Sequence, residues 1–177
     1  IIPAYNEEES IEKVINNLKQ NYSQYDYVII NDGSHDHTSE ICHKNKYKII
    51  DLPVNLGLTG AFQTGLKYAY KKGYDYAIQF DADGQHLPEY IPAMVDKIEE
   101  GYDMVIGSRF VEKPKPRSLR MLGSRVISTA IKITTGVHIA DPTSGMRLFN
   151  KTLIREFAEN INYEPEPDTV SFLIKQG

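Results

Sequence analysis

Cysteine, long apolar runs and, over one segment, acidic residues are scarce in this sequence. The single cysteine, Cys42, has no partner for an internal disulfide, which fits a reducing compartment. No apolar run approaches the roughly 20 residues that a membrane span needs. Because the chain starts at Ile1 without an initiator methionine, we expect it to be a domain truncated at both ends.

Acidic residues are absent between positions 113 and 140, although the whole chain has a net charge of −4. Six basic residues of this segment contribute +6, so the rest of the chain carries −10, which is −4 minus +6. They are Lys113, Lys115, Arg117, Arg120, Arg125 and Lys132. Such segregation can mark a surface for phosphates or for an anionic bilayer. The simpler interpretation is a solvated basic helix.

The rest of the composition is typical of a globular protein, with 41% hydrophobic and 25% charged residues. A length of 177 residues is enough for one domain with a sizeable core. We find no internal repeat, no low-complexity segment and no linker that would divide the chain. The sequence therefore predicts a single domain over residues 1–177.

Short apolar runs alternate with helical periodicity along the chain. Strands are predicted near residues 1–2, 27–30, 47–50, 76–80, 104–106 and 146–149. Helices are predicted near residues 11–18, 36–44, 61–69, 88–98, 119–135 and 152–159, with a last helix that contains Val170, Leu173 and Ile174. This alternation predicts an α/β fold with a mostly parallel central sheet flanked by helices.

Polar clusters follow four of the predicted strands, at residues 3–7, 31–34, 81–85 and 107–109. In sheets of this kind ligands bind at the carboxyl ends of the strands. We therefore expect the four loops to build one site at one edge of the sheet. This shared placement is stronger evidence than any single motif.

Asp81 and Asp83 stand two positions apart at the end of a predicted strand, and Gln85 follows at the next alternate position. Alternate residues of an extended chain share a face, so these oxygens can approach one cation. Oxygen ligands suit Mg²⁺ or Mn²⁺. The sequence thus predicts a metal site at Asp81, Asp83 and Gln85.

This motif has two other interpretations, a simple turn and a phosphatase nucleophile. A simple Asp-Gly turn after a strand would be the better explanation if the motif stood alone. Phosphatases that use the first Asp of Asp-x-Asp-Gly as nucleophile want Thr or Val where this chain has Gln85. They also need a downstream Lys followed by a paired acidic motif, which the sequence does not offer.

Several motifs together carry a family resemblance. They are residues 3–7, residues 31–34 with Asp36 and Thr38, residues 55–57 with Ala61 and Gly65, residues 81–86, residues 107–109, and residues 141–147. In this order and spacing the chain resembles family 2 glycosyltransferases of the GT-A fold, which is Rossmann-like. Within them it is similar to the branch of dolichyl-phosphate mannose synthase and bacterial polyprenyl-phosphate glycosyltransferases. The resemblance spans nearly the whole chain.

The resemblance implies a role for each matching position. The positions expected to bind the nucleotide-sugar are Pro3, Ala4, Tyr5, Glu7, Asp32, Asn55, Gly57, Asp81, Ala82 and Asp83. Arg109 and Arg147 are expected to face phosphates or the acceptor, and Arg120 with Ser124 would grip an acceptor phosphate. His35, His37 and His86 are interpreted as solvated or capping residues.

The implied activity is an inverting transfer that depends on Mg²⁺ or Mn²⁺, from a UDP- or GDP-linked donor. Asp83 and Arg109 are candidate catalytic residues that would offset charge on the leaving diphosphate. A lipid phosphate acceptor such as polyprenyl phosphate needs no base, whereas a saccharide hydroxyl does, and Asp141 is the candidate base.

The expected partners are therefore the donor, a lipid phosphate or saccharide acceptor and a membrane surface, and no nucleic acid. The expected location is the cytoplasmic face of a membrane. Alternatives are transfer to a saccharide hydroxyl in cell-surface polysaccharide synthesis, a non-catalytic nucleotide-sugar-binding module, and a sugar-nucleotide pyrophosphorylase. The last is disfavoured because its Arg-containing Gly-rich loop is replaced by residues 5–8.

Overall fold

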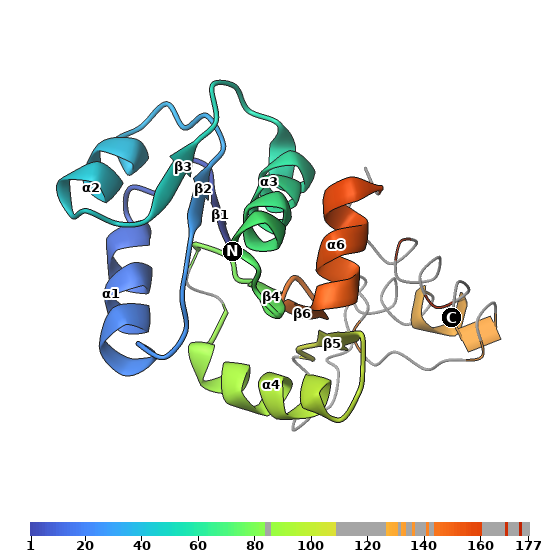
Figure 1. The fold of residues 1–177 in the computed structure, drawn as a ribbon. Helices are drawn as coiled ribbons and strands as arrows, with labels where there is room; N and C mark the ends of the chain where they lie inside the picture. Colours follow the sequence, from blue (N-terminus) through green and yellow to red (C-terminus); the bar gives the residue numbers. More distant parts are fainter. Residues whose placement is uncertain are drawn as a thin grey trace.

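The computed structural model of the chain describes residues 1–83, 86–108, 127–130, 132–133, 136, 141, 144–160, 169 and 174. Across these residues, strands and helices alternate and the strands form the centre of the fold (Figure 1). The strands are β1 (Ile2–Ala4), β2 (Ile29–Asn31), β3 (Ile49–Asp51), β4 (Tyr76–Gln79), β5 (Met104–Ile106) and β6 (Arg147–Asn150). The helices are α1 (Ile11–Asn21), α2 (Thr38–Lys44), α3 (Gly57–Lys72), the 3₁₀ helix η1 (Pro88–Tyr90), α4 (Ile91–Glu99) and α6 (Lys151–Glu159).

The first three strands form a parallel sheet in the order β1-β2-β3. Its register places Ala4 opposite Asn31 and Asn31 opposite Asp51, so the three strands end level with one another. Because the strands share one direction, the loops that follow them leave from the same edge. This edge is the one at which ligands bind in parallel α/β sheets.

The other three strands form a sheet in the order β4-β6-β5, in which β6 runs antiparallel to both neighbours. The last of the described strands therefore lies between two earlier ones. Gln79 of β4 and Ile106 of β5 both lie opposite Arg147, the first residue of β6. The turn that enters β6 consequently lies at the edge where β4 and β5 end.

Two hydrogen bonds join β1 to β4 and so connect the sheets. The Ile1 nitrogen donates to the Ile78 carbonyl at 2.8 Å, and the Phe80 amide donates to the Ile1 carbonyl at 3.0 Å. This is the pattern of a parallel pair. The described strands thus run in the order β3-β2-β1-β4-β6-β5, and β6 is the one that is reversed. The predicted, mostly parallel sheet is confirmed.

One face of the sheet is covered by α1, α2 and α4. Ile11 and Ile15 of α1 are fully buried against Ile29, which points to this face from β2. Ile91 and Met94 of α4 extend the same core. These apolar positions recur at helical spacing, which is why the segments fold as helices with one face inward.

The opposite face is covered by α3 and α6, which pack side by side (Figure 1). Phe149 of β6 lies between Phe62 of α3 and Phe157 of α6, with ring centroids 5.6 and 5.5 Å away. Ile30, the neighbour of Ile29 in β2, points to this side, as the alternation of a strand requires. The fold is therefore a sheet between two helical layers.

The predicted elements occur where they were expected, with shifted ends. In α3 the buried residues are the predicted ones, Ala61, Phe62, Gly65, Leu66 and Ala69. The helix predicted over residues 36–44 begins two residues later, at Thr38. Most of the helix predicted over residues 119–135 and all but one residue of the last predicted helix lie outside the described residues. Among the residues that the structure describes, no helix is both long and apolar enough to cross a bilayer.

Candidate active site

The loops after β1 and β2 are held together by hydrogen bonds. Asn6, which has a positive φ of 57°, donates its amide to the Ser34 hydroxyl at 3.0 Å and accepts from the His35 amide at 2.9 Å. The Glu7 amide donates to Thr38 Oγ1 at 2.8 Å. The polar loop predicted at residues 3–7 is therefore held in place by hydrogen bonds to the loop after β2. We call these two loops the first wall of the site.

Asp36 connects the same two loops to the start of α2. One carboxylate oxygen accepts from the amide and the hydroxyl of Thr38, at 3.0 and 2.6 Å. The other accepts from the Glu8 amide at 3.1 Å. Burial alone would raise the pKa of Asp36, but the hydrogen bonds from Thr38 and Glu8 hold it below its usual value. The charged form of Asp36 therefore stabilises the arrangement of these two loops.

Asp32 follows β2 and is buried, and one of its two carboxylate oxygens accepts a hydrogen bond from the loop after β3. Its Oδ1 accepts from the Leu56 amide at 2.7 Å, and its own amide donates to the Ala4 carbonyl at 2.8 Å. Gly33 follows with a φ of +66°, and a Cβ there would lie 2.8 Å from the Asn55 amide nitrogen. Glycine is thus required for residues 54–56 to approach Asp32.

Asn55 and Gly57 belong to the loop after β3 and the start of α3. The Gly57 amide donates to the Asn55 side chain at 3.0 Å, and Gly57 has a φ of +74° at the start of α3. Tyr5 is exposed and meets the His35 ring edge-on, with centroids 6.3 Å apart. The structure therefore brings Ala4, Asp32 and Asn55 together from the ends of three different strands.

Asp81 follows β4, the strand next to β1, and its carboxylate has a neighbour at each oxygen. Gln79 Nε2 lies 3.5 Å from Oδ1, and His86 Nε2 lies 3.4 Å from Oδ2. The Asp81 amide donates to His86 Nδ1 at 2.9 Å. His86 was predicted to be solvated or capping: its side chain is only 15% exposed, so it is not solvated, and its Nδ1 accepts a backbone amide as a capping residue does.

The turn that enters β6 packs directly against Asp81. A Cβ on Gly145 would lie 2.9 Å from Asp81 Oδ2 and 3.2 Å from His86 Cε1, so a side chain would displace both groups. Ser144 donates its hydroxyl to the Gly107 carbonyl, after β5. The loops after β4 and β5 and the turn before β6 therefore form a second wall of the site.

Asp141 and Arg147, predicted from the resemblance to act on the acceptor side, are both buried, at 1% and 3% exposed. Arg147 donates its Nε to the Ser144 carbonyl at 3.0 Å, and the Asp141 carbonyl accepts from the Ser144 amide at 3.2 Å. In this structure both residues form hydrogen bonds with Ser144 and so stabilise the turn that enters β6. Their roles toward an acceptor stay predictions.

The donor set suits a hard divalent cation. Asp81 is one-third exposed at its side chain and Asp83 is exposed, so two carboxylates one residue apart lie at the edge of the sheet where the strands β1, β2 and β4 end. Among the described residues, no cluster of three or more His, Cys, Asp and Glu side chains could hold a metal ion. Two carboxylates leave positions for water and phosphate oxygens, which Mg²⁺ commonly keeps.

Four predicted site residues lie outside the described residues: Gln85, Arg109, Arg120 and Ser124. Three neighbours of the Asp81 carboxylate were not predicted from the sequence: Gln79, His86 and Gly145. A signal for His86 existed in its position five residues after Asp81. Nothing local in the sequence indicates that Gly145 lies against them.

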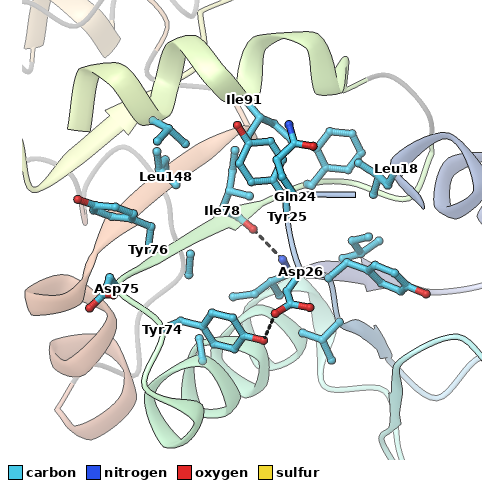
Figure 2. A pocket seen from close by; sticks show the side chains of 18 of the residues that line it. Leu18, Gln24, Tyr25, Asp26, Tyr74, Asp75, Tyr76, Ile78, Ile91 and Leu148 are labelled. Atoms are coloured by element: carbon cyan, nitrogen blue, oxygen red, sulfur yellow. Dashed lines mark hydrogen bonds between the residues drawn. The ribbon is translucent and has the colours of Figure 1, made fainter. Parts of the chain in front are cut away.

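A cavity of about 390 Å³ lies at the opposite edge of the sheet and is distinct from this site. It is lined mainly by apolar and tyrosine side chains around the starts of β2 and β4, among them Tyr25, Tyr74 and Ile78 (Figure 2). Tyr74 donates its hydroxyl to Asp26 at 2.8 Å at its rim. Since ligands bind at the carboxyl ends of such strands, this cavity is on the wrong edge for the donor.

Comparison with known proteins identifies a family for the chain. The model of the family described as Glycosyl transferase family 2 matches residues 1–157. The UDP-N-acetylglucosamine–dolichyl-phosphate N-acetylglucosaminyltransferase of Methanococcus voltae is 36% identical over 91% of this chain and 72% of that protein. The undecaprenyl-phosphate mannosyltransferase of Micrococcus luteus is 30% identical over 88% of this chain and 67% of that protein.

Among solved structures, the chain is similar to glucosyl-3-phosphoglycerate synthase from Mycobacterium tuberculosis in complex with Mn²⁺, UDP-glucose and glycerol 3-phosphate. The TM-score is 0.64 at 22% identity, covering 86% of this chain and 56% of that one. The chain thus spans little more than half of that structure. At this identity the likeness bears on the fold, which it supports.

Proposed function

The chain belongs to glycosyltransferase family 2, and from this membership we propose that it transfers a sugar from a UDP- or GDP-linked donor to polyprenyl phosphate. The observation that carries the proposal is the position of Asp81 and Asp83. They follow β4, the strand next to β1, at the edge from which the loops after β1, β2 and β3 leave. A diphosphate between the carboxylates and those loops would place its nucleoside against Asp32.

The nucleoside is held by the first wall. Asp32 uses Oδ1 for the Leu56 amide, which leaves Oδ2 to accept from a base N–H. Pro3, Tyr5, Glu7, Asn55 and Gly57 complete the pocket, largely through their backbone. Because the hydrogen bonds with Asp36 and Ser34 fix this wall before a ligand arrives, little ordering is needed on binding.

Asp81 and Asp83, with Gln85, would hold Mg²⁺ or Mn²⁺, and Mn²⁺ together with UDP-glucose is what the solved glucosyl-3-phosphoglycerate synthase contains. When bound, the cation supplies positive charge that stabilises the leaving diphosphate. Asp81 and Asp83 would orient the diphosphate, the backbone of Ala82, whose side chain is buried, would line it, and Arg109 would add a positive charge.

The acceptor is proposed to be a lipid phosphate. A phosphate oxygen forms the new bond to the anomeric carbon on the face opposite the nucleotide. The bond from that carbon to the diphosphate breaks, and its electron pair leaves with the nucleoside diphosphate. The configuration is therefore inverted. No proton must be removed from an ionised phosphate, so no base is required.

Three observations support this acceptor over a saccharide hydroxyl. Asp141, the candidate base for a hydroxyl, is 1% exposed and sits within the turn before β6. The acid-free segment of residues 113–140 supplies cations instead, including Arg120, near Ser124. Both relatives named above have a lipid phosphate in their names. A basic segment at an anionic bilayer would place the enzyme on the cytoplasmic face of a membrane.

The test is a panel of UDP- and GDP-sugars with Mn²⁺ and short-chain polyprenyl phosphate, in which the glycolipid product is measured. We expect one donor to be used. Replacement of both Arg120 and Arg125 by Ala should lower kcat/KM for polyprenyl phosphate by at least about tenfold, since each lost contact to a charged group is worth about 1.5–3 kcal/mol. Donor hydrolysis in the absence of acceptor should change little. Unchanged lipid transfer by the double variant, or transfer only to saccharides, would contradict the proposed acceptor.

A further inference from the structure

His86 contacts Asp81 through both of its ring nitrogens. The Asp81 amide donates to Nδ1 at 2.9 Å, while Nε2 lies 3.4 Å from Oδ2 of the same residue. A ring nitrogen that accepts a hydrogen bond carries no proton, so the neutral imidazole has its proton on Nε2. The backbone bond therefore selects the tautomer with its proton on Nε2, the ring nitrogen that lies nearer to the carboxylate.

The ring of His86 is also fixed in place. It packs edge-on against Phe80, with centroids 5.7 Å apart, and its side chain is only 15% exposed. Gly145 closes the other side, since a Cβ there would lie 3.2 Å from Cε1. Phe80 is itself in the core and bonded to β1. Packing against Phe80 and Gly145 therefore sets the position of the imidazole ring.

The second oxygen of Asp81 is supported by Gln79. Its Nε2 lies 3.5 Å from Oδ1, and the residue is 2% exposed in β4. With a donor near each oxygen, the plane of the Asp81 carboxylate is set by buried neighbours on two sides. The lone pairs that face outward remain for a ligand.

We propose that His86 is a positioning residue that orients the Asp81 carboxylate for a divalent cation. The inference rests on the proposed function, in which Asp81 is a metal ligand. Donors that support a ligating carboxylate typically affect metal affinity by 10- to 100-fold, because they fix the direction of its lone pairs. His86 itself touches neither the cation nor the substrate.

Two substitutions separate the two contacts of the ring. His86→Asn keeps an acceptor at the place of Nδ1 and removes the donor at Nε2. His86→Gln keeps a donor at the place of Nε2 and removes the acceptor at Nδ1. Lys151→Gln is the control, because Lys151 pairs with Asp75 at the opposite edge of the sheet. Thermal unfolding of each variant shows whether it is folded.

Titration with Mn²⁺ alone, followed by the electron paramagnetic resonance signal of free Mn²⁺, is the first measurement. We expect Kd to rise at least about tenfold in His86→Asn and markedly less in His86→Gln. Wild-type affinity in a folded His86→Asn variant would overturn the inference and leave the proposed function standing. A rise in Kd in His86→Gln alone would also overturn it, because the effect would then come from the hydrogen bond between the Asp81 amide and Nδ1. Failure of the wild-type chain to bind Mn²⁺ would overturn the proposed metal site itself.

The second measurement needs no metal. Two-bond ¹H–¹⁵N spectra of the ring nitrogens report which one is protonated, and the His86 signals are identified by their loss in His86→Asn. We expect the proton on Nε2 in the metal-free protein. A proton on Nδ1 would overturn the inference, whatever the Mn²⁺ titration shows.

Discussion

At the scale of single residues, the two carboxylates of the candidate metal site differ in their surroundings. Asp81 is held between Gln79 and His86, whereas Asp83 is exposed. An exposed side chain can be replaced at little cost to folding. Asp83 is therefore the better residue for testing the metal without disturbing the fold.

Asp83→Ala should lower kcat/KM for sugar transfer by at least about 100-fold, because a metal offsets leaving-group charge worth several kcal/mol. Its melting temperature should match the wild type. Transfer rates across a Mn²⁺ series, with and without a chelator, measure the effect. Asp75→Ala, at the opposite edge of the sheet, serves as the control. Full, chelator-sensitive activity in Asp83→Ala would exclude it as an essential ligand.

At the scale of elements, the arrangement of the loops after β1 and β2 depends on the Asp36 carboxylate, which joins three segments. Asp36 accepts from Glu8 in the first loop and from Thr38 at the start of α2. These bonds favour the charged form, so the pKa of Asp36 in the folded chain lies below its ordinary value of 3.8. The stabilisation that they give is present above that value and is lost as the pH falls through the folded-state pKa.

Asp36→Asn should reduce the free energy of unfolding by about 1–2 kcal/mol at neutral pH, as for other lost capping bonds. The difference between wild type and variant should be constant from pH 7 to about 5 and shrink below about pH 4. Urea unfolding across this range measures it. A difference that persists undiminished at pH 3 would contradict the assignment of a charged Asp36.

The sequence predicted elements well where local periodicity decides them, as in α1 and α3. Strand ends moved by one or two residues, because pairing with a neighbour and not the apolar run sets where a strand stops. The insertion of β6 between β4 and β5 was not predictable, since it depends on residues far apart in the chain. The burial of His86 was not predictable for the same reason, because Gly145, which packs against its ring, comes from the distant turn.

At the scale of the whole molecule, the helical layer of α3 and α6 is joined to the sheet through Phe149. This ring is 1% exposed and touches a phenylalanine from each helix. It lies in β6, three residues after the turn that supports Asp81. Packing on that face therefore supports the second wall of the site.

Phe149→Ala should destabilise the fold by about 3–5 kcal/mol, the usual cost of emptying a core aromatic position. Phe149→Leu should cost clearly less, because most of the volume is kept. Denaturant unfolding followed by circular dichroism should give one transition for each protein. Tyr102→Ala, at an exposed aromatic, is the matched control and should cost little. Two separated transitions would show that the two sheets unfold independently.

The central place of β6 has a consequence for how the chain folds. Ile2 and its partner Ile29 are 27 positions apart, whereas Gln79 and Arg147 are 68 apart. Closing a longer loop costs more entropy, and distant pairings slow folding. During synthesis the sheet of β1, β2 and β3 can therefore assemble before residue 147 has left the ribosome. The contact of Gly145 with Asp81 and His86 forms only after β6 has paired with β4, so the proposed metal site is completed later than the loops after β1 and β2.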